Sequence, residues 1–355
     1  MFNTVLITGG CGFIGSRLAR RIAPRVKTVI VLDNLHPQVH AVDNFDFTED
    51  NIRFVRGDIR GPEMTEVIAE TKPDLVFHLA AETGTGQSFD EPGRYCDVNV
   101  SGTAKLVEDL RRVEKKTRIV LAGSRAIYGE GAYRQVDGTI ASGRERNIEA
   151  MRAKDFEVYD VDGNALSPLP TPENLCPVPA SVYASSKLMQ EYILTQCAAD
   201  GDLDVGILRF QNVYGPGQSL KNPYTGVLSI FCAQILAGKN LEIYEDGEIV
   251  RDFVFVDDVV RSLAMMGFSE TMPDVAINIG TGYPATIREC ANILLQALGT
   301  DQQTLSVTGN FRPGDIRYAV ADISRAQANL GWEPQVGVAQ GLSQLAAWAK
   351  SEHNA

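Results

Sequence analysis

The sequence predicts an α/β fold with a doubly wound parallel sheet, and three observations support this. Apolar, strand-like runs alternate with segments of helical periodicity through about residue 210. A glycine-rich turn separates the first of these strands from the first helix. The second strand ends on an acidic residue, Asp33. At 355 residues the chain is long enough for a large core with a second lobe, but hardly for three domains.

The first strand, helix and second strand surround the glycine turn. An apolar run at residues 4–7 leads directly into the turn, and a β-branched run at 28–32 leads to Asp33. Between them, Ile14, Leu18 and Ile22 recur at helical spacing. The turn reads Thr8-Gly9-Gly10-Cys11-Gly12-Phe13-Ile14-Gly15.

This order of strand, glycine turn, helix and acidic strand end is typical of a dinucleotide-binding unit. We expect Gly10 to allow the tight turn, Gly12 to let the backbone approach a pyrophosphate, and Gly15 to let the helix lie close to the sheet. The start of the helix offers free N–H groups and a positive dipole end to that pyrophosphate.

Asp33 also predicts which dinucleotide binds. A carboxylate at this position accepts hydrogen bonds from both adenosine ribose hydroxyls and repels a 2′-phosphate. The next residues, Asn34 and Leu35, include no arginine that could bind such a phosphate. The predicted cofactor is therefore NAD rather than NADP.

The alternation continues along the chain. Strands are expected at residues 52–55, 75–78, 119–121 and 205–210, and helices at about 63–70, 98–114, 181–198 and 342–348. Leu79, Ala80 and Ala81 follow the fourth strand, and small residues there let a cofactor lie across its carboxyl end. His78 is interpreted as a packed residue at the end of that strand. Residues 130–175 are rich in charge, glycine and proline and show little periodicity.

Composition excludes several classes of partner. A net charge of −12 argues against nucleic acid or an anionic membrane as a partner, and an anionic substrate then requires a few locally placed arginines. The six cysteines are scattered without metal-ligand spacing, which predicts a reduced, cytoplasmic setting and no metal site. The first strand leaves no room for a signal peptide, and no apolar run is long enough to span a bilayer.

Three side chains form a candidate catalytic group. Tyr183 and Lys187 lie four residues apart on one predicted helix and share a face. The lysine ammonium and the charge of an oxidised nicotinamide favour the phenolate, so that the tyrosine becomes a base near neutral pH. Ser124 follows the fifth strand at the same edge of the sheet, where it can hydrogen-bond the reacting oxygen.

The chain resembles the extended short-chain dehydrogenases/reductases, in the NAD-dependent nucleotide-sugar epimerase/dehydratase family. The motifs that carry the resemblance cover most of the chain outside the insertion after Gly129, and they include residues 8–15, 57–59, 97–100, 181–187, 208–217, 251–258, 278–282 and 312–315. It implies a Rossmann-type NAD-binding domain at 1–210, with an insertion at about 130–175. A smaller α/β nucleotide-sugar-binding lobe at 211–355 has parts of the chain crossing back to the first domain.

The resemblance also implies the site residues. The catalytic residues are Ser124, Tyr183 and Lys187. Besides Tyr183 and Lys187, the positions expected to bind the cofactor are Gly9, Gly12, Phe13, Ile14, Gly15, Asp33, Asn34, Asp58, Ile59, Leu79, Ala80, Ala81 and Asn99. The positions expected to bind the sugar nucleotide, besides Ser124, are Thr83, Ser88, Asn212, Arg251 and Arg312, and the turn from Thr83 to Ser88 is expected to line the sugar pocket. Guanidinium groups suit a diphosphate in an acidic protein.

Within this family the sequence favours a 4-epimerase. The 4,6-dehydratases carry an Asp-Glu pair directly after the strand-five hydroxyl residue, and decarboxylases carry a glutamate nearby, whereas here Arg125 and Ala126 follow Ser124. The remaining set of tyrosine, serine and NAD is sufficient for reversible oxidation at C4, with hydride returned to the opposite face. Two alternatives to a 4-epimerase remain. One is another enzyme of the family, a dehydratase, decarboxylase or reductase, and the other is a non-catalytic NAD-binding regulator.

Residues 33–40, 129–134 and 170–173, the last two of which flank the insertion, resemble a bacterial branch of dTDP-L-rhamnose 4-epimerases. In that branch the insertion often carries cysteine pairs that resemble a small zinc site. Here the insertion holds only Cys176, near its end, so no sulfur-ligated zinc is expected. It either caps the sugar pocket or is a surface elaboration. The expected substrate is a dTDP- or UDP-linked hexose or deoxyhexose. The resemblance also implies a homodimer, because family members of this type pair two long helices, here at 98–114 and 181–198, into a four-helix bundle. The apolar faces of these helices could equally be buried against the sheet.

Overall fold

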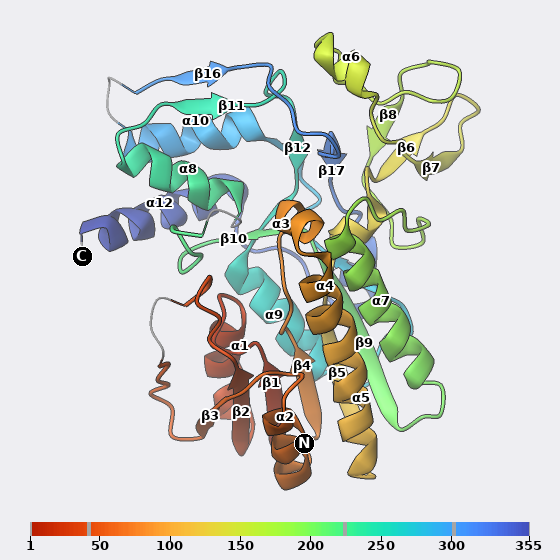
Figure 1. The fold of residues 1–355 in the computed structure, drawn as a ribbon, viewed down its shortest axis with the longest axis vertical. Helices are drawn as coiled ribbons and strands as arrows, with labels where there is room; N and C mark the ends of the chain where they lie inside the picture. Colours follow the sequence, from red (N-terminus) through yellow and green to blue (C-terminus); the bar gives the residue numbers. More distant parts are fainter. Residues whose placement is uncertain (1, 41–43, 223–225, 300–302, 355) are drawn as a thin grey trace.

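A computed structural model describes residues 2–40, 44–222, 226–299 and 303–354. Its lower half is a seven-stranded sheet with the order β14-β9-β5-β4-β1-β2-β3, and each neighbouring pair is parallel (Figure 1). The strands are β1 (Thr4–Thr8), β2 (Thr28–Asp33), β3 (Ile52–Arg56), β4 (Leu75–His78), β5 (Thr117–Ser124), β9 (Leu203–Phe210) and β14 (Ile277–Ile279). The predicted Rossmann-type parallel sheet is confirmed.

Helices cover both faces of this sheet. Helices α1 (Gly15–Ile22) and α9 (Val256–Gly267) bury residues in the same apolar cluster as Val5 and Ile7 of β1. Helices α2 (Pro62–Thr71), α5 (Gly102–Arg112) and α7 (Val182–Cys197) share a second cluster with Leu6. Neighbouring residues of a strand point to opposite faces, so a sheet covered on both sides needs the continuous apolar runs seen in the sequence. No helix in the described ranges is both long and apolar enough to span a bilayer.

The helix expected at 98–114 differs from the prediction in its first turns. Helix α4 (Pro92–Tyr95) leads into a π-helical segment, Cys96–Ser101, and α5 follows. Within that segment the Asn99 side chain bonds Glu82 and Ser186, and Thr103 Oγ1 donates to the Asn99 carbonyl at 2.6 Å. These contacts accompany the local widening of the helix, a feature common near functional sites.

The C-terminal part of the chain forms a lobe above the sheet (Figure 1). Three small sheets pair β10 (Asn212–Tyr214) with β13 (Phe253–Phe255), β11 (Leu241–Ile243) with β16 (Leu305–Val307), and β12 (Val250–Arg251) with β15 (Ala285–Thr286) and β17 (Tyr318–Ala319). The lobe also contains α8 (Val227–Leu236), α10 (Ile287–Leu298), α11 (Ser324–Leu330) and α12 (Val338–Asn354).

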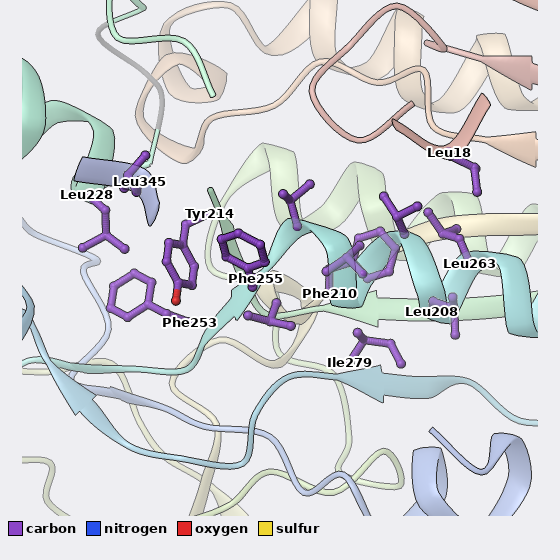
Figure 2. Packing of buried hydrophobic residues seen from close by; sticks show 14 of the residues in the cluster. Leu18, Leu208, Phe210, Tyr214, Leu228, Phe253, Phe255, Leu263, Ile279 and Leu345 are labelled. Carbon is purple, nitrogen blue, oxygen red and sulfur yellow. The ribbon is translucent and has the colours of Figure 1, made fainter. Parts of the chain in front are cut away.

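The lobe and the sheet share one core. Tyr214, Phe253 and Phe255 of the lobe lie in the same buried cluster as Leu208 and Phe210 of β9 (Figure 2). Because apolar side chains run without interruption from one part to the other, the lobe is held over the carboxyl ends of the strands.

The insertion forms regular secondary structure, although its sequence shows little periodicity. Strand β6 (Ala132–Arg134) pairs antiparallel with β7 (Ile140–Ser142) and β8 (Ser167–Leu169), and α6 (Ile148–Arg152) lies between β7 and β8 in the sequence. Strands of three residues are too short to show an alternating pattern. The insertion lies beside β12 and β17 of the lobe (Figure 1), and Thr171 N–H donates to the Val320 carbonyl at 2.8 Å.

We predict that Gly15→Ala destabilises the protein. A Cβ at Gly15 would lie 2.5 Å from the Gly9 carbonyl oxygen and 2.6 Å from the Gly10 Cα, so backbone would have to move. The expected loss in the free energy of unfolding is about 1–3 kcal/mol by urea denaturation. Gly93→Ala in α4 is the control, because a Cβ there meets nothing within 4 Å. Equal stability of the two variants would contradict the close packing of α1 on the turn.

Candidate active site

A pocket of about 270 Å³ opens where the sheet meets the lobe. Its lining comes from the ends of β5 and β9, from α3 (Thr85–Asp90), from α7 and from β12, and consists of Thr85, Ser124, Arg125, Ala126, Tyr183, Phe210, Gln211, Asn212, Arg251 and Asp315. Ligands of open α/β sheets bind at this edge, outside the carboxyl ends of the strands.

The glycine turn fits a dinucleotide pyrophosphate. Gly9 has φ +67°, and a Cβ there would lie 2.7 Å from Ala80 N. A Cβ on Gly12 would meet only the Gly9 carbonyl oxygen, at 3.3 Å, so the space in front of Gly12 is open. Helix α1 has no side-chain cap and no acidic residue in its first turn, which leaves its N–H groups available for an anion.

The predicted role of Gly10 is corrected by this geometry. The left-handed conformation of the turn is at Gly9, where φ is positive, and not at Gly10. A Cβ on Gly10 would lie 2.7 Å from Val31 Cγ1, so Gly10 is needed for the close approach of the turn to β2.

Asp33 is held at the end of β2 with its carboxylate fixed. Its two oxygens accept hydrogen bonds from the backbone N–H groups of Cys11 at 3.0 Å and Leu35 at 2.9 Å. Each oxygen keeps a second lone pair, as the ribose hydroxyls of NAD require. His40 Nε2 lies 3.7 Å from Asp33 Oδ1. Asn34 donates to Asp58 at 3.0 Å.

The other predicted cofactor residues lie around the same edge. The Asp58 carboxylate accepts hydrogen bonds from Arg60, which lower its pKa to about 2. Ile59 is buried beneath Gly102 of α5, and Leu79, Ala80 and Ala81 are half-buried after β4. Asn99 does not face solvent: its amide bridges the backbone of Glu82 and the Ser186 hydroxyl.

His78 is a packed, neutral residue, as predicted. Its Nδ1 lies 2.8 Å from Thr8 Oγ1 and its Nε2 lies 2.9 Å from Thr103 Oγ1. Burial, and to a lesser extent the charge of Lys187, lowers its pKa to about 3.

The catalytic candidates come together at the floor of the pocket. Ser124, the last residue of β5, lines the pocket together with Tyr183, and its Oγ accepts from Ala126 N–H at 3.2 Å. The Tyr183 ring makes an edge contact with Tyr95, with ring centroids 6.3 Å apart. Lys187 lies one turn further along α7 and is buried.

Two contacts fix the orientation of helix α7. Its N-cap Ser181 accepts from Ala184 N–H at 3.1 Å through its hydroxyl. Glu191, one turn beyond Lys187, forms a buried ion pair with Arg209 of β9 at 2.8 Å. The first of these contacts caps α7, and the second ties the helix from which Tyr183 projects to the sheet.

Burial controls the protonation of the pair. It raises the pKa of Tyr183, while the hydrogen bond with Ser124 lowers it. Burial lowers the pKa of Lys187 to about 8, and Glu191 opposes this shift. In the protein alone the pKa of Tyr183 is raised, because desolvation outweighs the effect of Ser124. The expected lowering of this pKa, which includes the charge of the oxidised nicotinamide, stays a prediction.

Among the predicted substrate residues, Asn212 and Arg251 line the pocket together with Ser124. Arg251 Nη2 pairs with Asp315 Oδ1 at 2.7 Å. Arg312 is exposed outside this pocket, with its guanidinium 5.0 Å from the centroid of the Tyr244 ring.

Of the turn expected to line the sugar pocket, residues 83–88, Thr85 is among the lining residues, whereas Thr83 and Ser88 are not. The Thr83 carbonyl accepts from the Tyr95 hydroxyl at 2.6 Å, and the Ser88 hydroxyl is buried and donates to the Thr85 carbonyl at 2.7 Å.

Several residues of the pocket were not selected from the sequence, among them Arg125 and Gln211. Arg125 donates to the Gly129 carbonyl at 2.7 Å, and burial, followed by the charge of Arg251, lowers its pKa to about 10. Gln211 is buried, and its Oε1 has no hydrogen-bond partner among the described residues. Their positions next to Ser124 and Asn212 in the sequence were the only available signal.

Comparisons with known proteins agree with this geometry. The model of the NAD dependent epimerase/dehydratase family matches residues 5–280. The dTDP-L-rhamnose 4-epimerase of Burkholderia thailandensis is 37% identical over 351 residues, which cover 98% of this chain and 95% of that enzyme.

Solved structures give the same result. UDP-glucose 4-epimerase of Thermotoga maritima, solved with UDP-glucose, is similar with a TM-score of 0.81 and 31% identity, covering 98% of this chain and 99% of that one. The complex of Thermus thermophilus UDP-glucose 4-epimerase with NAD gives a TM-score of 0.75 and 28% identity, covering 98% and 99%. The expectation that NAD is the cofactor is confirmed. The family match and the identity to these relatives show that the chain belongs to the NAD-dependent epimerase/dehydratase family.

Proposed function

We propose that this protein is a nucleotide-sugar 4-epimerase acting on a dTDP- or UDP-linked hexose or deoxyhexose. The observation that carries the proposal is that Ser124 and Tyr183 line one pocket, which also contains Asn212 and Arg251. The similarity to a dTDP-L-rhamnose 4-epimerase and to a UDP-glucose 4-epimerase supports it.

The proposed chemistry needs only these side chains and the cofactor. Tyr183 removes the proton from the C4 hydroxyl, and Ser124 hydrogen-bonds the same oxygen in every step. The glycine turn and Asp33 would hold NAD, which would supply the hydride acceptor for C4 and, in its reduced form, the hydride donor for the opposite face. Tyr183 then gives the proton back to the C4 oxygen. Because Asn212 and Arg251 hold the diphosphate, the 4-keto sugar is free to turn between the two transfers.

The lining of the pocket favours this reaction over the related ones. Elimination at C5–C6 needs an acid and a base, and the structure places Arg125 and Ala126 in the pocket directly after Ser124. A decarboxylase of the family needs a glutamate in the same neighbourhood. A non-catalytic regulator has no need for a buried Tyr183–Lys187 pair, and burying that lysine is costly.

We also propose a homodimer through α7 and the segment from Cys96 to Arg112. Met189 and Tyr192 are 45% and 47% exposed on the outer face of α7, and Ser185 and Gln196 extend the same stripe. Phe89 is 84% exposed at the end of α3, next to α7 in the fold. A second copy of this chain would cover these apolar side chains.

A cytoplasmic location stays a prediction based on the six cysteines, each of which is described and free.

The first prediction concerns turnover. Wild-type protein incubated with a panel of dTDP-, UDP-, GDP- and CDP-sugars, without added NAD, should convert a dTDP- or UDP-sugar into a mixture of C4 epimers, followed by NMR. Tyr183→Phe should lower kcat by about 10²–10⁴-fold while NAD binding is retained. Tyr192→Phe, on the exposed side of the same helix, is the matched control and should keep full activity. Undiminished turnover by Tyr183→Phe would remove this residue as the base.

The second prediction concerns the buried lysine. A pKa lowered from 10.5 to about 8 means that Lys187 costs about 3 kcal/mol of stability at pH 7. Protein freed of bound nucleotide should therefore be stabilised by Lys187→Met by about this amount, although the variant loses activity.

The pH dependence of this difference follows from the direction of the shift. Between pH 8 and 10.5 the unfolded chain binds the proton that the folded chain has lost, so the wild type gains stability with rising pH and the advantage of Lys187→Met disappears. Urea denaturation of both proteins across this range measures it, with the exposed Lys116→Met as control. A difference that stays constant with pH would contradict the shifted pKa.

The third prediction concerns assembly. The double variant Met189→Asp/Tyr192→Asp should be monomeric by light scattering, because charges cannot be buried unpaired in an interface. Val161→Asp changes an apolar residue of the insertion that is 67% exposed, and should leave the dimer intact. A monomeric wild type would overturn the proposed dimer.

A further inference from the structure

The insertion is joined to the lobe by a buried ion pair. Arg146 lies between β7 and α6, and its guanidinium pairs with both oxygens of Glu245, with Nη1–Oε2 and Nη2–Oε1 distances of 2.8 Å. The side chains are 2% and 0% exposed. Bidentate pairing of this kind is strongly directional. The two groups therefore fix the insertion relative to the loop that follows β11.

The same guanidinium also reaches a second loop of the lobe. Arg146 Nη2 donates to the Asp315 carbonyl at 2.8 Å. The side chain of Asp315 in turn pairs with Arg251 at 2.7 Å, and both of these residues line the pocket. Only two contacts thus separate Arg146 of the insertion from the arginine proposed to bind the diphosphate.

Further contacts tie the insertion to these two loops. Glu130 Oε1 accepts from the N–H groups of Arg317 at 2.6 Å and Tyr318 at 3.3 Å, and from the Tyr133 hydroxyl at 3.0 Å. Arg317 pairs with Asp246 at 2.6 Å. The loops at 244–247 and 315–318 are therefore held together by charged groups from both sides.

The conformation of Glu245 depends on this arrangement. Glu245 has φ +53°, in the left-handed region that non-glycine residues seldom adopt. Such a conformation persists where the surroundings fix it, and here the side chain is held by Arg146 and, at 3.3 Å, by Arg317. Tyr244, the preceding residue, carries the ring under Arg312.

We propose that the insertion serves substrate binding, and that Arg146 is the positioning residue through which it acts. Arg146 holds the Asp315 backbone and the 244–247 loop, so that Arg251 and Tyr244 keep their places around the nucleoside diphosphate. The glycine turn and Asp33 are outside this network, so the NAD site is independent of it. The inference rests on the proposed function, because it assigns a nucleoside diphosphate to the pocket.

The test uses Arg146→Met, with Arg152→Met as the matched control. Arg152 belongs to the same insertion, but it is 64% exposed and pairs with Glu149 within α6. For each holoenzyme, the affinity for UDP and dTDP is measured by isothermal titration, and Tm, kcat and KM are determined. The affinity for NAD is measured on the same proteins freed of bound nucleotide. Arg146→Met should weaken the binding of UDP or dTDP, and raise KM, by about tenfold, with kcat and NAD affinity near wild type. Arg152→Met should match the wild type.

A second pair of variants separates positioning from stability. Arg146→Met leaves a buried carboxylate with one partner fewer, which lowers Tm. Arg146→Met/Glu245→Met removes both charges, so it should recover Tm while KM stays high, because the Asp315 contact is still absent. Arg146→Lys keeps the charge but cannot form the bidentate pair, and it provides a milder change if Arg146→Met does not fold.

Three outcomes overturn the inference. One is an unchanged affinity of folded Arg146→Met or Arg146→Lys for UDP and dTDP. Another is a loss of affinity for NAD that equals the loss for UDP and dTDP and parallels the fall in Tm. Such a result would make Arg146 merely structural. A wild type that binds no nucleoside diphosphate would overturn the proposed function and this inference together, whereas the first two leave the proposed function intact.

Discussion

The parallel pairing of β5 with β9 is the interaction on which the site depends. These strands are in register over eight residues, from Thr117 opposite Leu203 to Ser124 opposite Phe210. Because both end at the same level, the residues that follow them enter one pocket, and Arg209 of β9 ties α7 to the sheet through Glu191. A shift of this register by one residue would turn Ser124 to the other face and separate it from Tyr183.

Charge is used sparingly in the pocket of this acidic protein. Lys187 is buried, Tyr183 is kept neutral by burial, and Arg251 is partly neutralised by Asp315. Arg125 has no carboxylate within ion-pair distance among the described residues, so a ligand oxygen is its natural partner. The low dielectric of the site strengthens each of these interactions once a cofactor and an anionic substrate are present.

Much of the fold was predictable because it rests on local patterns. The apolar runs, the helical spacing of Ile14, Leu18 and Ile22, and the glycine turn each depend on residues close in sequence. The π-helical segment at Cys96–Ser101 was not predictable, because it depends on contacts of Asn99 with Glu82 and Ser186. The strands of the insertion were not predictable because they are too short to show a period.

The sequence by itself determined the parallel sheet, the choice of NAD through Asp33, and the candidates Ser124, Tyr183 and Lys187, since each follows from a motif of adjacent or regularly spaced residues. Only the tertiary structure decided that Gly9 rather than Gly10 takes the left-handed conformation, that Arg125 and Gln211 line the pocket, and that Arg146 meets Glu245. These outcomes depend on burial and on pairs far apart in sequence, and neither leaves a local pattern.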